Sequence, residues 1–165
     1  MPDKKTLALA QKDKREGKSP STQAGEFVHE EIEHIRAGKH GARSTEQAIA
    51  IGLSKARRAG IKLPPPQKGT TSQQVREQAA RDTERGKHPK KAPNPKRSRA
   101  MKKKLKGEGH RIVSSAALSR HARASAKRRT AAERSASAKR AVRTKGAAKR
   151  SIAAKKAANT RAAAD

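Results

Sequence analysis

The sequence lacks cysteine, tryptophan and tyrosine, and Phe27 is its only phenylalanine. Without cysteine the chain has no disulfide framework, thiolate nucleophile or cysteine-based zinc site. Large aromatic side chains usually anchor a core, so their scarcity argues against a globular enzyme with a deep pocket. Leu, Ile, Val and Phe together number 18 of 165 residues, well below the fraction at which a highly charged chain folds throughout. We therefore expect a small core, no catalytic residues and no cofactor.

Long apolar runs are also absent, and none approaches the ~18 residues of a membrane span. Residues 1–14 lack the apolar stretch of a secretory signal. What the chain has instead is positive charge, with 43 Lys and Arg against 14 Asp and Glu and a net charge of +29. We therefore expect a cytoplasmic protein that does not bind membranes. The commonest partner of such a polycation in the cytoplasm is nucleic acid.

Charged and apolar residues separate along the chain. Residues 96–165 carry 23 basic and 3 acidic side chains, whereas nine of the 18 Leu, Ile, Val and Phe residues lie within the 37 residues from Phe27 to Leu63. This asymmetry is typical of a nucleic-acid-binding tail on a small ordered unit. It predicts a mostly α-helical protein whose tail is largely disordered or transiently helical. The expected parts are a polar segment 1–18, a helical hairpin 19–66, a short helix with a Pro/Lys linker 67–95, and a basic low-complexity tail 96–165.

The hairpin is predicted from helix caps and apolar spacing. Ser19-Pro20 favours a helix start, and Ser44 with Gln47 fits a capping box for a second helix. Gly60 suits the end of that helix, in a Schellman motif. Gly52 either lets the two helices approach closely or weakens the second one. The expected core is Phe27, Val28, Ile32, Ile35, Ile49 and Leu53. So small a core favours a homodimer or folding on a partner.

The tail uses few residue types and contains a repeat. AAERSASAKRAVRT at 131–144 and AAKRSIAAKKAANT at 147–160 share eight of fourteen positions. These units have nothing large to stack, so duplicated low-complexity sequence is the better interpretation than a solenoid. Ala, Lys and Arg favour helix, but like charges repel at i, i+4. We expect a free tail that is mostly disordered and gains helix on phosphate binding.

The segment HEEIEH, from His29 to His34, raises the question of a metal site. Zinc proteases place two histidines at i and i+4 on one helical face. Here the spacing is five, which separates the two side chains by about 140° around a helix. No third ligand in a packed pocket is evident from the sequence. We therefore expect solvated histidines and no metal site.

Two hypotheses concern IGLSKARRAGI, residues 51–61. It resembles a helix-hairpin-helix module only faintly, because that module needs two glycines in its turn and this segment has Gly52 within a helical pattern. A basic helix end that touches phosphate through Lys55, Arg57, Arg58 and Lys62 is the stronger interpretation. A merely solvated basic face remains the alternative to both.

Base-stacking modules need aromatic platforms, which this chain lacks. What remains is phosphate contact by Lys and Arg, which is strong, salt-sensitive and nearly blind to sequence. The predicted nucleic-acid contacts are the 23 cations of the tail. They are Lys96, Arg97, Arg99, Lys102, Lys103, Lys104, Lys106, Arg111, Arg120, Arg123, Lys127, Arg128, Arg129, Arg134, Lys139, Arg140, Arg143, Lys145, Lys149, Arg150, Lys155, Lys156 and Arg161.

Residues 17–66 read GKSPSTQAGEFVHEEIEHIRAGKHGARSTEQAIAIGLSKARRAGIKLPPP. This segment, and most specifically residues 38–60 within it, resembles a family of small basic bacterial proteins classed as a domain of unknown function and often called DNA-binding. The resemblance continues loosely through KRSRAMKKKLKGEG into the tail. It implies a bacterial source and no established site residues. In composition, the tail separately resembles the tails of linker histones and bacterial histone-like proteins.

These observations favour a nucleoid-associated, histone-H1-like protein that binds duplex DNA without sequence specificity and compacts or bridges it. An RNA-binding ribosome-associated factor or RNA chaperone is the first alternative, because charge alone does not separate DNA from RNA. The second is an adaptor whose hairpin recruits a protein partner while the tail tethers it to DNA.

Overall fold

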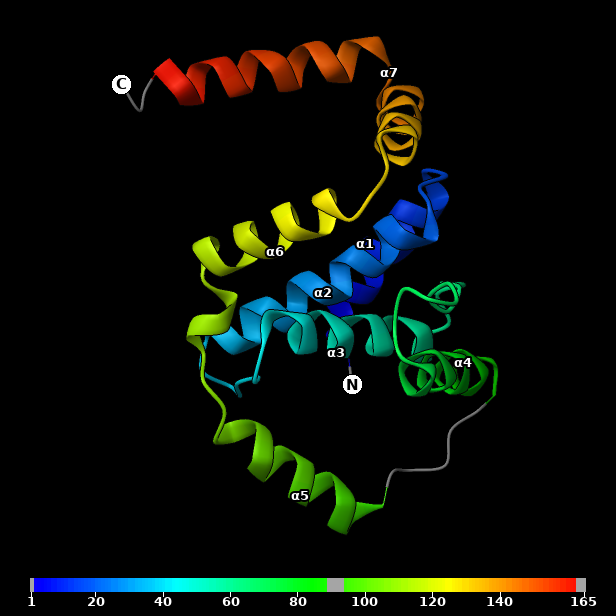
Figure 1. Ribbon diagram of the computed structural model, residues 1–165, viewed down its shortest axis with the longest axis vertical. Helices are drawn as coiled ribbons and strands as arrows, with labels where there is room; N and C mark the ends of the chain where they lie inside the picture. Colours follow the sequence, from blue (N-terminus) through cyan, green and yellow to red (C-terminus); the bar gives the residue numbers. More distant parts are fainter. Residues whose placement is uncertain (1, 89–93, 163–165) are drawn as a thin grey trace. The chain divides into compact units, whose positions relative to one another are not determined.

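The computed structural model describes residues 2–88 and 94–162 (Figure 1). Within these ranges the regular structure is helical apart from one isolated β-bridge, between Lys68 and Thr71. The chain divides into two compact units, residues 1–121 and 122–165. The elements are α1 (Lys4–Arg15), α2 (Pro20–Arg36), α3 (Thr45–Arg58), α4 (Gln73–Lys87), α5 (Pro95–Lys106), the 3-10 helix η1 (Arg111–Val113), α6 (Ser115–Lys127) and α7 (Ala131–Ala162). Over the described residues, none of these helices has the length and apolarity to cross a membrane.

The caps predicted for α2 and α3 are present. Ser19 Oγ accepts the backbone N–H of Thr22 at 3.4 Å, and Ser44 Oγ accepts that of Gln47 at 3.2 Å. The Gln47 side chain reaches back one residue further than a standard capping box, to the backbone N–H of Arg43. At the other end of α3, Gly60 adopts φ 89°. The backbone N–H of Ile61 then bonds to Ala56 O, as a Schellman motif requires.

Two small apolar clusters hold the first unit together. One joins Phe27 and three alanines, Ala10, Ala24 and Ala56, from α1, α2 and α3. The other joins Ile35, Ala42, Ala48 and Val113. Of the six core residues predicted from the sequence, Phe27 and Ile35 are fully buried and Val28, Ile32, Ile49 and Leu53 are half-buried. The α2–α3 pair is therefore part of a larger unit in which α1, α4 and η1 pack against it.

Gly52 permits the close approach of α2 and α3. A Cβ atom at this position would lie 2.6 Å from Val28 Cα and 3.0 Å from Phe27 O, much closer than atoms can pack. Of the two roles considered for this glycine, helix approach is the correct one.

The prediction that the ordered part is a hairpin followed by a disordered tail is wrong. The beginning of the expected tail is built into the first unit, where Val113 is 1% exposed. Thr45 Oγ1 donates to Ile112 O at 2.6 Å, and Arg36 donates to Val113 O at 3.2 and 3.3 Å. The backbone N–H of Gly41 also donates to Leu105 O at 2.7 Å. These contacts join segments 64 to 77 residues apart, which local sequence patterns do not reveal.

The rest of the expected tail is helical as well, in α6 and α7. Repulsion between cations is limited in α7. Lys139 and Arg143 are spaced at i, i+4, as are Lys145 and Lys149, but the other six cations of this helix have no like charge at that spacing. Ala, Lys and Arg are strong helix formers, so their propensity prevails. The expectation that helix forms only on binding is therefore also corrected.

Gly146 divides α7 into two helical segments. Its φ of 65° and ψ of 170° are not helical, and only glycine adopts such values readily. The break lies between the two copies of the repeat, 131–144 and 147–160. Each copy therefore forms one helical segment. The low-complexity composition did not predict that the repeat units would match structural units.

Candidate nucleic-acid interface

The densest group of predicted contacts lies on α5. Asn94 caps this helix, its Oδ1 accepting the backbone N–H groups of Lys96 and Arg97, and Pro95 occupies the first helical position. The helix buries no residue, so its seven cations, Lys96, Arg97, Arg99, Lys102, Lys103, Lys104 and Lys106, are exposed. At a helical step of about 100°, they cover about 220° of the circumference. The remaining arc carries Met101 and Leu105.

Contacts with the rest of the first unit hold the C-terminal end of α5 in place, and thereby position its cations. Its final carbonyls lie next to the turn before α3, where the Gly41 N–H binds Leu105 O. A Cβ atom on Gly41 would lie 2.0 Å from Glu108 O, so this approach requires glycine. Three lysines lie in the last turn of the helix, Lys103, Lys104 and Lys106, where the helix dipole favours positive charge.

Seven predicted contacts lie between η1 and the start of α7, two in the first unit and five in the second. Arg111 and Arg120 in the first unit are exposed, as are Arg123, Lys127 and Arg128 in the second. Arg129 and Arg134 also make local bonds, since Arg134 donates to Arg129 O at 2.6 Å and Arg129 donates to Glu133 O at 3.0 Å. These two side chains help to join α6 to α7 and are less free to move than their neighbours.

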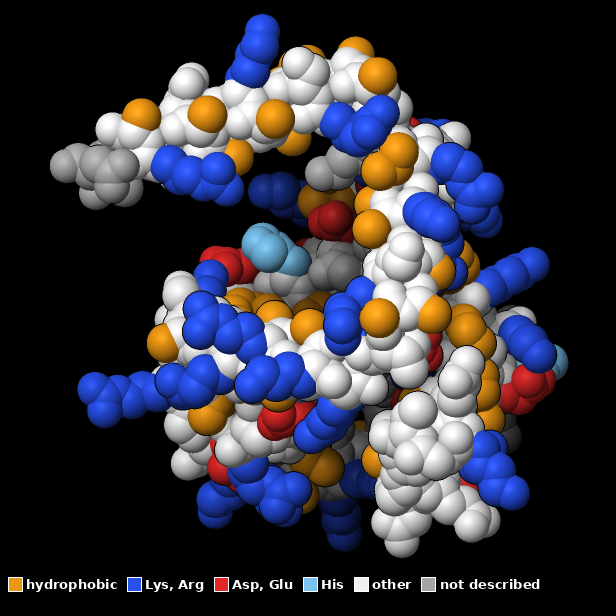
Figure 2. Space-filling view, turned by 45° about the horizontal axis from the view of Figure 1, so that its top comes forward, with side chains coloured by type: hydrophobic (Ala, Val, Ile, Leu, Met, Phe, Trp, Pro, Cys, Tyr) orange, Lys and Arg blue, Asp and Glu red, His pale blue; other side chains and the backbone are white. Residues whose placement is uncertain are grey.

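On α7, Lys139, Arg140 and Arg143 border a shallow hollow together with Ala136. In the second segment, Arg150, Lys155, Lys156 and Arg161 are exposed. The side chains of Lys145 and Lys149 lie outside the described part of the chain. Figure 2 shows Lys and Arg side chains projecting along the helices, with fewer Asp and Glu side chains among them.

Three of the four secondary contacts predicted on the first unit have partners within the protein. Lys55 Nζ lies 2.5 Å from Glu31 Oε2, and Arg58 Nε lies 3.6 Å from Asp82 Oδ1. Arg57 is 7% exposed and donates to the carbonyls of Leu63 and Pro64. Burial lowers the pKa of the Arg57 guanidinium, an effect that the charge of Asp82 partly opposes. Of the four, Lys62 is exposed.

Residues 14–68 match a protein family described as a family of unknown function (DUF6496). The matched stretch covers α2, α3 and their connections. The predicted likeness of this part to a domain of unknown function is thus confirmed. No curated protein and no solved structure gave a significant match.

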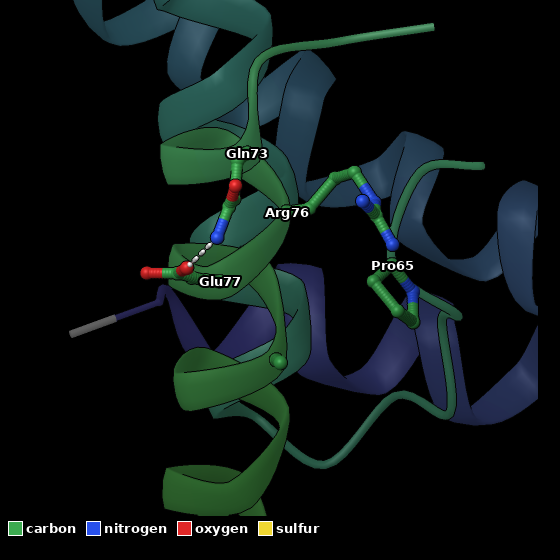
Figure 3. Close-up of a pocket in the computed structure, with 5 residues that line it drawn as sticks. Pro65, Gln73, Arg76 and Glu77 are labelled. Atoms are coloured by element: carbon green, nitrogen blue, oxygen red, sulfur yellow. Dashed lines mark hydrogen bonds between the residues drawn. The ribbon is translucent and has the colours of Figure 1, made fainter. Parts of the chain in front are cut away.

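A hollow of about 270 Å³ lies between α4 and the proline segment. It is lined by Pro65, Gln73, Arg76, Glu77 and Ala80 (Figure 3). Gln73 donates to Glu77 Oε1 at 2.9 Å. Arg76 points toward Pro65 (Figure 3), and its Nε is buried without a hydrogen-bond partner in the described part of the chain. The lining offers one guanidinium and one carboxylate that already has a partner.

A group of ionisable side chains around the end of α2 was not predicted from the sequence. Glu31, His34 and His40 bring their ligand atoms within 4.8 Å of one another. His29, the residue that suggested a metal motif, is exposed. The useful spacing is His34 to His40, which spans the helix end and the following turn. Gly38, with φ 70°, was a signal that the chain reverses there.

Proposed function

We propose that this protein binds duplex DNA without sequence specificity and is a nucleoid-associated protein that compacts or bridges DNA. The observation that carries the proposal is the exposure of cations on α5, α6 and α7. Residues 96–165 contain 23 basic and 3 acidic side chains. Cations on preformed helices lose less conformational entropy on binding than cations on a disordered chain.

The two units contribute differently to this function. On α5 the cations share one broad face of a helix whose C-terminal end is held by the rest of the first unit. They therefore contact one stretch of phosphates as a group. On α7 they are carried by two helical segments that meet at Gly146. Two short cationic helical segments with a break between them can contact the phosphates of separate DNA segments, and such contacts would bridge the two DNA segments. Both modes use the DNA backbone and carry no base readout.

Two alternatives use other features of the molecule. RNA also offers phosphates, so charge alone does not separate the proposed function from that of an RNA-binding ribosome-associated factor or RNA chaperone. An adaptor would use the α2–α3 region for a protein partner and the cationic helices as a tether. Phe27 and Ile35 are fully buried within this chain. A homodimer therefore is not required to cover them and stays a prediction, as does a place in the nucleoid.

Full-length variants with matched charge test the proposal. The α5 variant changes Lys102, Lys103, Lys104 and Lys106 to Gln, and the α7 variant changes Lys139, Arg140, Lys155 and Lys156 to Gln. A control changes the exposed α1 lysines Lys4, Lys5, Lys12 and Lys14 to Gln, and so removes the same charge. Duplex affinity, measured by fluorescence anisotropy, should fall at least tenfold more in the first two than in the control.

Equal losses in all three variants would show that net charge alone governs binding and would contradict the assigned interface. Competition among duplex DNA, structured RNA and single strands on the unaltered protein then separates the nucleic acids. A preference for structured RNA would favour the first alternative. Weak binding to every nucleic acid would contradict all three functions, because the adaptor also needs the cationic helices to tether it to DNA.

A further inference from the structure

A buried carboxylate lies between two histidines where α2 ends. The Glu31 side chain is 1% exposed, and its Oε1 lies 3.3 Å from His40 Nε2. A ring nitrogen of His34 completes a group whose ligand atoms are all within 4.8 Å. On the far side of the carboxylate, Lys55 Nζ lies 2.5 Å from Oε2. Neither Glu31 oxygen has a partner aligned as a hydrogen bond within the described residues.

The backbone determines which nitrogen of His40 is free. Nδ1 of this ring lies 3.2 Å from Gly41 O, and a carbonyl oxygen can only accept, so Nδ1 carries the proton. In the neutral ring, Nε2 then holds a lone pair that faces the carboxylate oxygen. Two acceptors at 3.3 Å repel each other unless a cation lies near both.

The geometry of the contact between His40 Nε2 and Glu31 Oε1 distinguishes a shared metal ion from a shared proton. A proton shared by Nε2 and Oε1 would form a nearly straight hydrogen bond, and this pair is close without such alignment. Ligands of a tetrahedral metal instead aim at a third point, about 35° away from the line between them. Two ligands about 2.0 Å from zinc lie about 3.3 Å apart, which is the spacing of this pair.

His34 has a similar arrangement. Its Nε2 lies 3.3 Å from Asp3 Oδ2, so a proton on Nε2 leaves the lone pair on Nδ1. A histidine that ligates a metal commonly gives its other N–H to a carboxylate or a backbone carbonyl. Asp3 is placed to accept the other N–H of His34, and Gly41 O is placed to accept the other N–H of His40. The two rings are 6.3 Å apart at their centroids and nearly perpendicular.

The local charge also favours a divalent cation. Three carboxylates, those of Asp3, Glu30 and Glu31, meet one ammonium group, that of Lys55. With both imidazoles neutral, the group carries two negative charges more than positive ones. Two of the carboxylates, Glu30 and Glu31, are buried at 6% and 0% exposure. The Asp3 side chain is exposed, so one negative charge of this excess is buried, which is costly. A divalent ion would balance that charge together with the charge of Asp3.

We propose that Glu31, His34 and His40 bind a divalent transition metal of the zinc class. Glu31 Oε1, a ring nitrogen of His34 and His40 Nε2 are the ligands, which leaves a fourth position for water. Lys55 holds the other Glu31 oxygen. The metal joins α2 to the turn that contains Gly41, and that turn holds the end of α5. This site is separate from the proposed DNA contacts.

Zinc titration of the full, untagged protein, freed of nucleic acid, tests the proposal. Isothermal calorimetry should show one Zn²⁺ per chain. His40→Gln and His34→Gln should each lower the affinity at least about 100-fold, since losing an outer partner alone lowers it 10 to 100-fold. The control is His29→Gln, an exposed histidine on the same helix, which should change the affinity less than twofold.

Cobalt gives an independent readout that needs no variant. Co²⁺ in the unaltered protein should show the intense visible bands of tetrahedral coordination, and Zn²⁺ should bleach them. Circular dichroism of the metal-free variants shows whether they fold, so a loss of binding is not mistaken for unfolding. Weak spectra like those of hydrated Co²⁺, or equal losses with His29→Gln and His40→Gln, would overturn the site.

Discussion

At the scale of single residues, two glycines on facing helices should respond oppositely to alanine. Gly52→Ala places a methyl group 2.6 Å from Val28 Cα, so α2 and α3 must separate. We expect a loss of about 1–3 kcal/mol in the free energy of unfolding. Gly25→Ala in α2 meets nothing within 4 Å and should gain about 1 kcal/mol from helix propensity. Urea unfolding followed by circular dichroism measures both, and a stabilising Gly52→Ala would contradict the close contact.

A second residue-scale prediction concerns the boundary of the folded unit. Val113 is 1% exposed, whereas Val142 on α7 is 44% exposed. Val113→Ala should therefore lower the free energy of unfolding of the first unit by about 2–3 kcal/mol. Val142→Ala is the matched control and should change it by less than about 0.5 kcal/mol. Identical denaturation midpoints for the two variants would show that Val113 is not part of the folded first unit.

These residues show what sequence could and could not predict. Phe27 and Ile35 were identified as core because they share a face at helical spacing, which is a local property. Val113 was not, because it is buried against Ile35, Ala42 and Ala48, which lie far away in the chain. Glu31 was not identified as buried, because charged residues are usually exposed. Its burial became intelligible only with Lys55 and His40 beside it.

At the scale of elements, the start of α7 should respond to acid. Thr130 and Glu133 form a reciprocal cap, in which Glu133 Oε2 accepts the Thr130 N–H at 2.8 Å and Thr130 Oγ1 accepts the Glu133 N–H at 3.2 Å. The backbone N–H and then the hydroxyl of Thr130 hold the pKa of Glu133 below its usual value. A lowered folded-state pKa stabilises the helix start above pH about 4.3, the value of free Glu.

That stabilisation should therefore be lost as the pH falls through the folded-state pKa. The measurement is the amide shift of Thr130 by NMR between pH 7 and pH 2, which isolates this cap from other carboxylates. In Glu133→Gln the amide can still be capped, but its shift should no longer titrate in this range. A Thr130 amide that titrates equally in both proteins would show that another group governs this helix start.

The tail also shows why an element can be misjudged from composition. Its residues favour helix, and the prediction of disorder rested on repulsion between cations. That repulsion depends on register, and adjacent pairs such as Lys155-Lys156 avoid it. The repeat was visible in the sequence, but the role of Gly146 was not, because a single glycine inside a helical pattern is often tolerated. Its φ of 65° marks the boundary between the copies.

At the scale of the whole molecule, most acidic residues lie in residues 1–95, whereas residues 96–165 carry most of the net positive charge. Within the first unit, the buried carboxylates of Glu31 and Asp82 form ion pairs with Lys55 and Arg58, respectively. The cations of α5 to α7 meet few acidic groups, because residues 96–165 carry only 3. Positive charge near α2 and α3 thus supports the fold, while positive charge further along the chain is available to phosphates.

Salt dependence should show this division directly. Each phosphate that a cation neutralises on B-DNA contributes about −0.9 to the slope of log K against log salt concentration. If about eight cations bind at once, the slope is near −7 and the affinity falls by about four decades between 50 and 200 mM salt. Two duplexes of unrelated sequence should give the same slope, because backbone contacts carry no base readout.

The charge variants then assign that slope to particular helices. The α5 variant removes four cations from one face, so its slope should be flatter by up to about 3.6, at 0.9 for each lost contact. The α1 control should keep the slope of the unaltered protein. Arg→Lys changes on α7 should also leave it unchanged, since a phosphate contact needs charge and not the guanidinium fork. A shallow slope in the unaltered protein, or a hundredfold preference for one duplex that persists at high salt, would require a base-reading surface in place of phosphate binding.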